Sequence, residues 1–117
     1  MESTWVKTNQ ALAELEKRIK SQLSMLTTIP LTVTQAYILR ALYFHDGQRP
    51  MDLAHGIGRE ATAFTPVLDA LERAGLIQRH PNTEDRRSIR IDLTIKGRTL
   101  AIDVTAILDE VEAEYIK

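Results

Sequence analysis

Three histidines, His45, His55 and His80, are the side chains of this sequence best suited to acid–base chemistry or metal binding. They fall in different predicted elements, and no pair has the i,i+4 or HExxH spacing of a helical metal site. Glu84 and Asp85 are paired carboxylates, but they lie beside arginines in a polar turn, where ion pairing is expected instead of catalysis. No glycine-rich phosphate loop occurs. We therefore expect no enzyme, no metal site and no cofactor.

The composition is that of one small globular domain, with 117 residues of which 44% are apolar and 26% charged. The absence of cysteine excludes disulfides, thiolate zinc sites and thiol-based sensing. No apolar run approaches the roughly 18 residues of a membrane-spanning helix. The sequence MESTWVKTNQ at the N-terminus also lacks the apolar core of a signal peptide. We expect a cytoplasmic protein.

Basic and acidic residues are unevenly distributed along the chain, although the formal net charge is only −1. Residues 27–98 carry ten bases, nine of them arginine, and eight acids, which gives a net charge of +2. Residues 99–117 carry one base and five acids, which gives −4. A generally basic nucleic-acid coat protein is excluded, but local DNA binding by the arginine-rich middle is not.

Arg86 and Arg87 are the strongest candidates for binding a ligand. Residues 77–80 and 88–93 alternate between apolar and polar side chains, which predicts two half-buried strands. The polar turn PNTEDRR between them places both arginines at a hairpin tip, where cations can enter a minor groove. We expect Asp85 to hold one of them in a single rotamer. A solvated, charged turn is the alternative.

Helical periodicity predicts the elements that must position this hairpin. Apolar residues recur at helical spacing over 3–26, from Thr32 to the His45-Asp46-Gly47 stop, over 49–57, over 59–74, and from Thr94 to the C-terminus. Thr32 and Gln35 have the form of a capping box. The expected fold is mainly α with a small β-hairpin, in the order of a helix-turn-helix with a β wing.

The outward face of the helix over 59–74 carries small or basic side chains suited to base edges, namely Arg59, Thr62 and Thr65. An ordinary surface helix is the alternative. Pro66 interrupts this face, because proline lacks an N–H and clashes with the preceding turn. Either the helix kinks there, or it begins late with Thr65 as its cap and Pro66 at its first position.

The two terminal helices carry apolar stripes that the short domain between them cannot fully cover. We expect the stripes to form a dimer seam, with 1–30 and 94–117 as dimerisation helices around a DNA-binding domain at 31–93. The alternative is that both stripes cover the core of one chain. The residues of the expected seam are Trp5, Leu12, Ile19, Leu26, Leu100, Val104, Ile107 and Val111.

The stretch 31–97 resembles the winged-helix core of the MarR family of transcriptional regulators. The segment EDRRSIRIDLTIKG is similar to the family's wing motif, and LERAGLIQR leads into it in the same way. The resemblance implies a homodimer on a roughly palindromic operator of double-stranded DNA. It also implies a recognition helix over 59–74 in the major groove and a wing over 81–88 in the minor groove.

Carried onto this chain, the resemblance gives DNA contacts by Thr62, Thr65, Arg86 and Arg87, with Asp85 as the residue that orients the wing. We add Arg49, Arg59 and Arg90 to the expected DNA-binding residues. Pro66 departs from the family, which commonly has a basic or polar residue there, and the helical tail after the wing is short. A winged-helix interaction or dimerisation module that has lost operator binding is therefore the alternative function.

The family often binds small aromatic or phenolic effectors between the dimer helices and the winged domain. Trp5, Tyr37, Tyr43 and Phe44 are the aromatic residues that we expect to line such a space, although aromatic residues at helical spacing also form cores.

Overall fold

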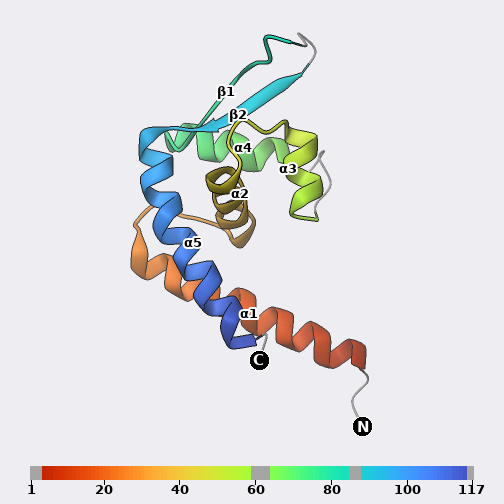
Figure 1. Cartoon of the computed structure of the whole chain (residues 1–117). Coiled ribbons are helices and arrows are strands. Elements are labelled where there is room, and N and C mark those ends of the chain that lie inside the picture. The colour runs from red at the N-terminus through yellow and green to blue at the C-terminus, as the bar shows by residue number, and fades with distance from the viewer. Residues whose placement is uncertain (1–3, 59–63, 85–87, 116–117) are drawn as a thin grey trace.

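The computed structural model describes residues 4–58, 64–84 and 88–115. Within these ranges the chain has the expected fold, mainly α with one antiparallel hairpin. The elements are α1 (Thr4–Leu26), α2 (Val33–Phe44), α3 (Pro50–Gly56), α4 (Phe64–Arg73), β1 (Ile77–Pro81), β2 (Ile89–Leu93) and α5 (Ile95–Tyr115). Figure 1 shows α2, α3, α4 and the hairpin gathered in one lobe, from which α5 runs back to α1.

The start of α2 forms the predicted capping box. The hydroxyl of Thr32 accepts a hydrogen bond from the backbone N–H of Gln35 at 3.1 Å, and the amide oxygen of Gln35 accepts one from the N–H of Thr32 at 2.9 Å. At the other end, the helix stops at Phe44, and Gly47 has φ +75°. That left-handed backbone turns the chain sharply toward α3.

The hairpin pairs β1 and β2 in antiparallel register, from Ile77 opposite Leu93 to Pro81 opposite Ile89. Ile77, Ile91 and Leu93 are buried on one face, as the alternating sequence predicts. A bridge between Gln48 and Ile91 joins the turn after α2 to the hairpin. The wing is therefore held against the helical lobe by backbone pairing as well as by apolar contact.

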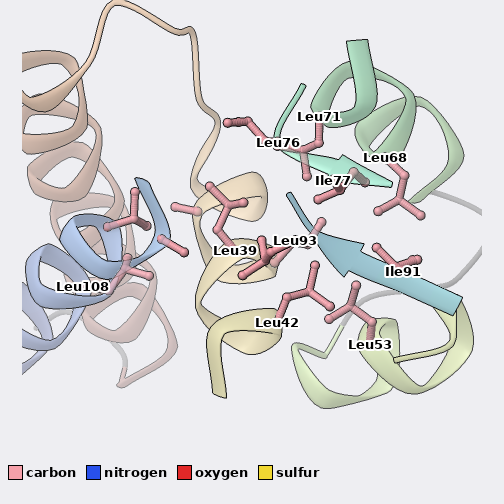
Figure 2. Packing of buried hydrophobic residues seen from close by; sticks show 14 of the residues in the cluster. Leu39, Leu42, Leu53, Leu68, Leu71, Leu76, Ile77, Ile91, Leu93 and Leu108 are labelled. Atoms are coloured by element: carbon pink, nitrogen blue, oxygen red, sulfur yellow. The ribbon is translucent and has the colours of Figure 1, made fainter. Parts of the chain in front are cut away.

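The core lies where α2 meets α5 on one side and the hairpin and α4 on the other. Figure 2 shows Leu39 and Leu42 of α2 between these two groups, with Leu108 of α5 on one side and Leu93 of β2 on the other. All are buried. Apolar burial stabilises a fold roughly in proportion to the buried area. Since α2 buries one side against α5 and the other against the hairpin and α4, it holds the two halves of the fold together.

The terminal helices meet the rest of the chain unequally. The C-terminal half of α1 packs on α5, where Ile19 and Leu23 are buried. Its N-terminal half extends away from the body of the molecule in Figure 1. In the described ranges, no helix combines the length and the apolar character needed to cross a membrane.

Candidate nucleic-acid interface

Helix α4 presents one buried and one exposed face beside the wing. Phe64, Leu68 and Leu71 are buried, at the helical spacing that the sequence shows. Thr65 and Pro66 are exposed. Phe64 and Thr65 are already helical where the structure describes α4, and Pro66 follows them. The expected late start with Thr65 as cap is therefore wrong, and the kink at Pro66 stays a prediction.

Five of the predicted DNA-binding residues lie outside the described residues, and their assignments stay predictions. They are Arg59 and Thr62 before α4, and Asp85, Arg86 and Arg87 at the wing tip. The neighbouring elements are described. Residues 59–63 come between α3 and α4, and residues 85–87 come between the two strands of the wing.

Arg49 is the predicted contact with the most exposed charge among those described. It precedes α3, and its Nε donates to Oδ2 of Asp52 at 3.1 Å while half of its side chain remains exposed. An exposed pair of this kind holds an arginine only weakly. Arg49 is therefore free to exchange this partner for a phosphate.

Arg90 has an internal role that its sequence position did not reveal. Its Nη1 donates to the backbone carbonyl oxygen of Gly47 at 2.9 Å, and the residue is partly buried. Beside it, the amide of Asn82 is buried and donates to the hydroxyl of Ser88 at 3.1 Å. The Arg90 bond ties the base of the wing to the turn after α2, and the Asn82 bond joins the two sides of the wing.

The segment LERAGLIQR contains an ion-pair cluster that sequence reasoning matched as a motif without giving it a role. Arg79 of β1 reaches back to α4, where its Nη2 lies 2.6 Å from Oδ1 of Asp69 and 2.8 Å from Oε1 of Glu72. Hydrogen bonding to Arg79 holds the pKa of Glu72 below its ordinary value. The cluster ties β1, and with it the wing, to α4, on the side of the helix that also carries Thr65.

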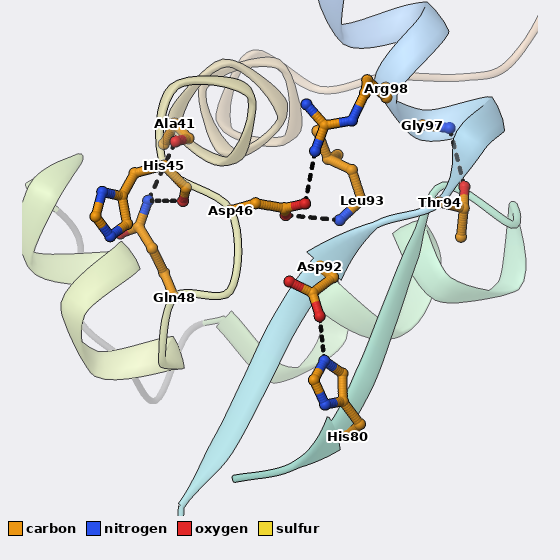
Figure 3. A network of polar contacts seen from close by, with 10 residues as sticks. All are labelled: Ala41, His45, Asp46, Gln48, His80, Asp92, Leu93, Thr94, Gly97 and Arg98. Carbon is orange, nitrogen blue, oxygen red and sulfur yellow. Dashed lines mark hydrogen bonds and ion pairs between the residues drawn. The ribbon is translucent and has the colours of Figure 1, made fainter. Parts of the chain in front are cut away.

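A second network joins the wing to α5 and was not predicted. Figure 3 shows Asp46 between the two elements, with one oxygen toward the backbone N–H of Leu93 and the other toward Arg98. Thr94, just before α5, accepts a hydrogen bond from the N–H of Gly97 at 2.9 Å and donates to the carbonyl of Gly75 at 2.6 Å. The turn HDG and the motif LTIKG therefore meet at one junction.

The expected effector-lining residues are only partly brought together. Tyr37 and Phe44 line a pocket of about 330 Å³ with Arg40 and Ile57, between α2 and the end of α3. Tyr43 is not among its lining residues, and the side chain of Trp5 lies outside what the structure describes. Burial raises the pKa of Tyr37 above its ordinary value, and Glu112 raises it further.

The predicted dimer seam divides into buried and open parts within a single chain. Ile19, Val104 and Val111 are buried by the chain's own α1, α2 and α5. Leu26, Leu100 and Ile107 are half-buried, and Leu12 is 50% exposed. Met25, Ile95 and Ile102 are exposed as well, but helical spacing places them on other faces of α1 and α5 than the stripe.

No group of three or more His, Asp or Glu side chains within 4–58, 64–84 and 88–115 is arranged to hold a metal ion. The open cleft at the base of the wing, about 490 Å³, has mixed charge, with Arg49 and Arg90 facing Asp52 and Glu84.

Helices α2, α3 and α4, followed by an antiparallel hairpin on the same core, define a winged helix-turn-helix protein. The sequence profile of the MarR family matches residues 31–89, half of the chain. The protein belongs to the MarR family, whose members are DNA-binding transcriptional regulators and not enzymes.

Solved structures of other regulators superpose on nearly the whole chain. Staphylococcus aureus MepR in complex with DNA is 26% identical, with a TM-score of 0.89 over 99% of this chain and 84% of MepR. Another crystal structure of MepR, described as a transcription regulator of the multidrug efflux pump MepA, gives a TM-score of 0.74 at 26% identity, over 98% and 83%. A cysteine-to-serine variant of E. coli MarR, complexed with operator DNA, shares the fold at 21% identity, with a TM-score of 0.79 over 92% and 75%.

Proposed function

We propose that this protein is a sequence-specific regulator that binds double-stranded DNA as a homodimer. The helix of residues 59–74 enters the major groove, and the wing of residues 81–88 reaches the adjacent minor groove. The observation that carries the proposal is the close match to MepR in its DNA complex. The TM-score is 0.89 against MepR in its DNA complex and 0.74 against the other MepR structure of equal identity.

The residues take their roles from their positions on the two reading elements. Thr62 and Thr65 face base edges from the recognition helix, and Arg59 contacts phosphate or base at its start. Arg86 and Arg87 enter the minor groove, with Asp85 orienting them. In addition, Arg49 reaches the phosphate backbone from the start of α3, where it exchanges its exposed partner Asp52 for the more strongly charged backbone.

Arg90 contributes chiefly by holding the wing at its base. Since its Nη1 is bonded to Gly47, the strand that carries the wing arginines starts from a fixed point. We propose that its other guanidinium nitrogens contact phosphate.

The homodimer forms through the open part of the terminal stripes. In this division of the chain, 1–30 and 94–117 dimerise and 31–93 binds DNA. Leu12, with the half-buried Leu26, Leu100 and Ile107, supplies apolar surface, and Trp5 extends it toward the N-terminus. Ile19, Val104 and Val111 support this surface from beneath, because their own area is already buried. Two-fold symmetry then matches a palindromic operator, with recognition helices about 34 Å apart or a small multiple of that.

The direct test is selection of bound duplexes from a random pool, followed by salt titration of the selected operator. Substitution Arg87→Ala is expected to weaken binding to all sequences and to reduce the salt slope by about 1. Arg18→Ala is the matched control, because it removes the same charge from α1, where Arg18 pairs with Glu114. Thr65→Val is expected to change the selected sequence instead. An Arg87→Ala variant with unchanged binding at every salt concentration would refute the wing assignment.

The alternative is a winged-helix interaction module without operator binding. It is favoured by the overall charge of −1 and by Pro66, which lies exposed near the start of α4. The same selection decides between the two, because a module of this kind enriches no duplex and shows no salt-dependent shift.

We also propose that the Tyr37 pocket accepts a small aromatic effector. Tyr37 and Phe44 supply aromatic surface, and Arg40 lines the same pocket, 5.0 Å from the centre of the Tyr37 ring. Titration with benzoates tests this idea. Release of DNA by the parent, but not by a Tyr37→Ala variant that still binds DNA, supports it, and equal release by both contradicts it.

A further inference from the structure

Helices α2 and α5 run antiparallel and are joined by ion pairs at two separate places. Near the end of α5, Nη1 of Arg40 lies 2.9 Å from Oδ1 of Asp109, and Nη2 lies 2.7 Å from Oε1 of Glu112. We call this cluster the Arg40 clamp. Only 20% of the Arg40 side chain is exposed, and its guanidinium lies over the ring of Tyr37. A partly buried arginine with two carboxylate partners is held more firmly than an exposed pair.

The second place lies just beyond the end of α2 and is shown in Figure 3. Oδ2 of Asp46 lies 2.6 Å from Nη2 of Arg98 near the start of α5, and Oδ1 accepts the N–H of Leu93 at 2.9 Å. We call this cluster the Asp46 clamp. The order of charges is reversed between the two clamps, because α2 supplies the arginine in one and the turn after it supplies the carboxylate in the other. A slide of α2 toward the start of α5 would bring Arg40 toward Arg98, and a slide in the other direction would bring Asp46 toward the acids of α5.

The clamps fix the position of α2 along α5, which the apolar contacts between the two helices determine only weakly. Leu39 and Leu42 pack on α5 through Ala101, Val104 and Leu108, and such contacts have little directional preference. Charge-assisted hydrogen bonds do have direction. Arg98 and Asp109 are eleven residues apart, which is about 16 Å along a helix. Two fixed points at that separation oppose both sliding and rocking of α2 on α5.

The same end of α5 also holds the recognition helix. The ammonium of Lys96 donates to the carbonyl of Ala74 at 2.9 Å, and the hydroxyl of Thr94 donates to that of Gly75 at 2.6 Å. Both carbonyls lie at the C-terminal end of α4. The direction of α4 is therefore tied to the first turn of α5, and the direction of α5 is tied to α2.

We infer that the Arg40 clamp and the Asp46 clamp are positioning elements that fix α4 relative to α5 and so set the operator half-site separation that the dimer accepts. The inference rests on the proposed function, since α5 belongs to the dimerising part. The clamps touch no DNA. Their loss alters the geometry between the two recognition helices, whereas affinity for a single half-site is kept.

The first test measures affinity for a series of operators whose half-sites are separated by added or removed base pairs. The parent is expected to prefer one separation strongly. Arg40→Gln and Arg98→Gln are each expected to reduce that preference about threefold to tenfold, with affinity for an isolated half-site unchanged. Arg98→Lys keeps the charge and is expected to restore most of the preference. Arg18→Gln is the control, because it breaks an α1–α5 pair, with Glu114, that does not involve α2, and Arg18 is as exposed as Arg98.

The second test measures geometry without DNA. The chain has no cysteine, so Arg73→Cys offers a single site for a spin label on exposed α4. Double electron–electron resonance on the dimer is expected to give one narrow distance, broadened by Arg40→Gln or Arg98→Gln and unchanged by Arg18→Gln. Folded clamp variants with the parent's distance distribution and spacing preference would overturn the inference. A parent that gives no inter-subunit distance and binds no duplex would instead overturn the proposed function.

Discussion

Gly97 and the carbonyl oxygen of Leu76 approach each other so closely that a Cβ added to Gly97 would lie 1.8 Å from that oxygen. Gly97 is in the first turn of α5, and Leu76 directly precedes β1. The helix and the strand therefore meet backbone to backbone, which only glycine permits. This contact explains the last residue of the LTIKG motif and positions α5 beneath the wing.

Replacing Gly97 with alanine should be strongly destabilising. The nearest obstacle is backbone, which cannot rotate away as a side chain can, so α5 must shift from β1. We expect the free energy of unfolding to fall by about 2–4 kcal/mol in urea denaturation. Gly56→Ala is the matched control, because nothing lies within 4 Å of its added Cβ, and its effect should be neutral or slightly stabilising. Equal stabilities of the two variants would show that the α5–β1 contact adjusts freely.

Thr94 is expected to stabilise the fold through the hydrogen bonds of its hydroxyl alone. Thr94→Ala removes the acceptor for the N–H of Gly97 and the donor to Gly75, and should lower the free energy of unfolding by about 1–2 kcal/mol. Thr99 lies within α5, and its hydroxyl donates to the carbonyl of Ile95 four residues earlier. Thr99→Ala should therefore change thermal stability little, within about 0.5 kcal/mol. A Thr94→Ala melting curve that overlays that of Thr99→Ala would contradict the capping role.

The ion pair between Glu72 and Arg79 predicts a specific dependence of stability on pH. Hydrogen bonding to Arg79 lowers the pKa of Glu72 from its ordinary 4.5, so the folded protein binds this proton less readily than the unfolded chain. The stabilisation of the fold by this ion pair is thus complete above pH 4.5, and it is lost as the pH falls through the lower pKa that Glu72 has in the folded protein. Urea denaturation should show parent and Glu72→Gln differing at pH 7 and converging in acid. A difference that stays constant down to the most acidic folded sample would exclude this linkage.

The sequence predicted the fold because its local signals agree with the tertiary contacts. Thr32 and Gln35 form the capping box that their spacing indicates, and Gly47 and Gly75 have the positive φ that helix stops favour. The hairpin followed from alternation, since Ile77 and Ile91 are buried where polar neighbours are not. The family resemblance was confirmed by the match over residues 31–89.

The tertiary role of charged residues could not be predicted in the same way. Arg90 bonds to a residue 43 positions away and Arg98 to one 52 positions away, and no periodicity encodes such pairs. The terminal stripes show a related limit. Spacing identifies an apolar face but not its partner, so it could not separate Ile19, buried within the chain, from Leu12, which is exposed. The pairing of Glu72 with Arg79 could have been suspected from the sequence, because both residues lie in the segment LERAGLIQR, whose resemblance to the family was already noted.

The exposed part of the α1 stripe gives a sharp test of the dimer. Leu12 lies on the half of α1 that extends from the body of the chain and is 50% exposed. If it is buried between subunits, Leu12→Lys should raise the dimer dissociation constant by about tenfold to a hundredfold, because it removes apolar area and buries a charge. Light scattering at micromolar concentration measures this shift. Phe44→Lys is the matched control, since Phe44 is 68% exposed on α2, away from the terminal stripes. Monomeric parent protein, or equal dissociation of both variants, would argue that Leu12 faces solvent in the functional state.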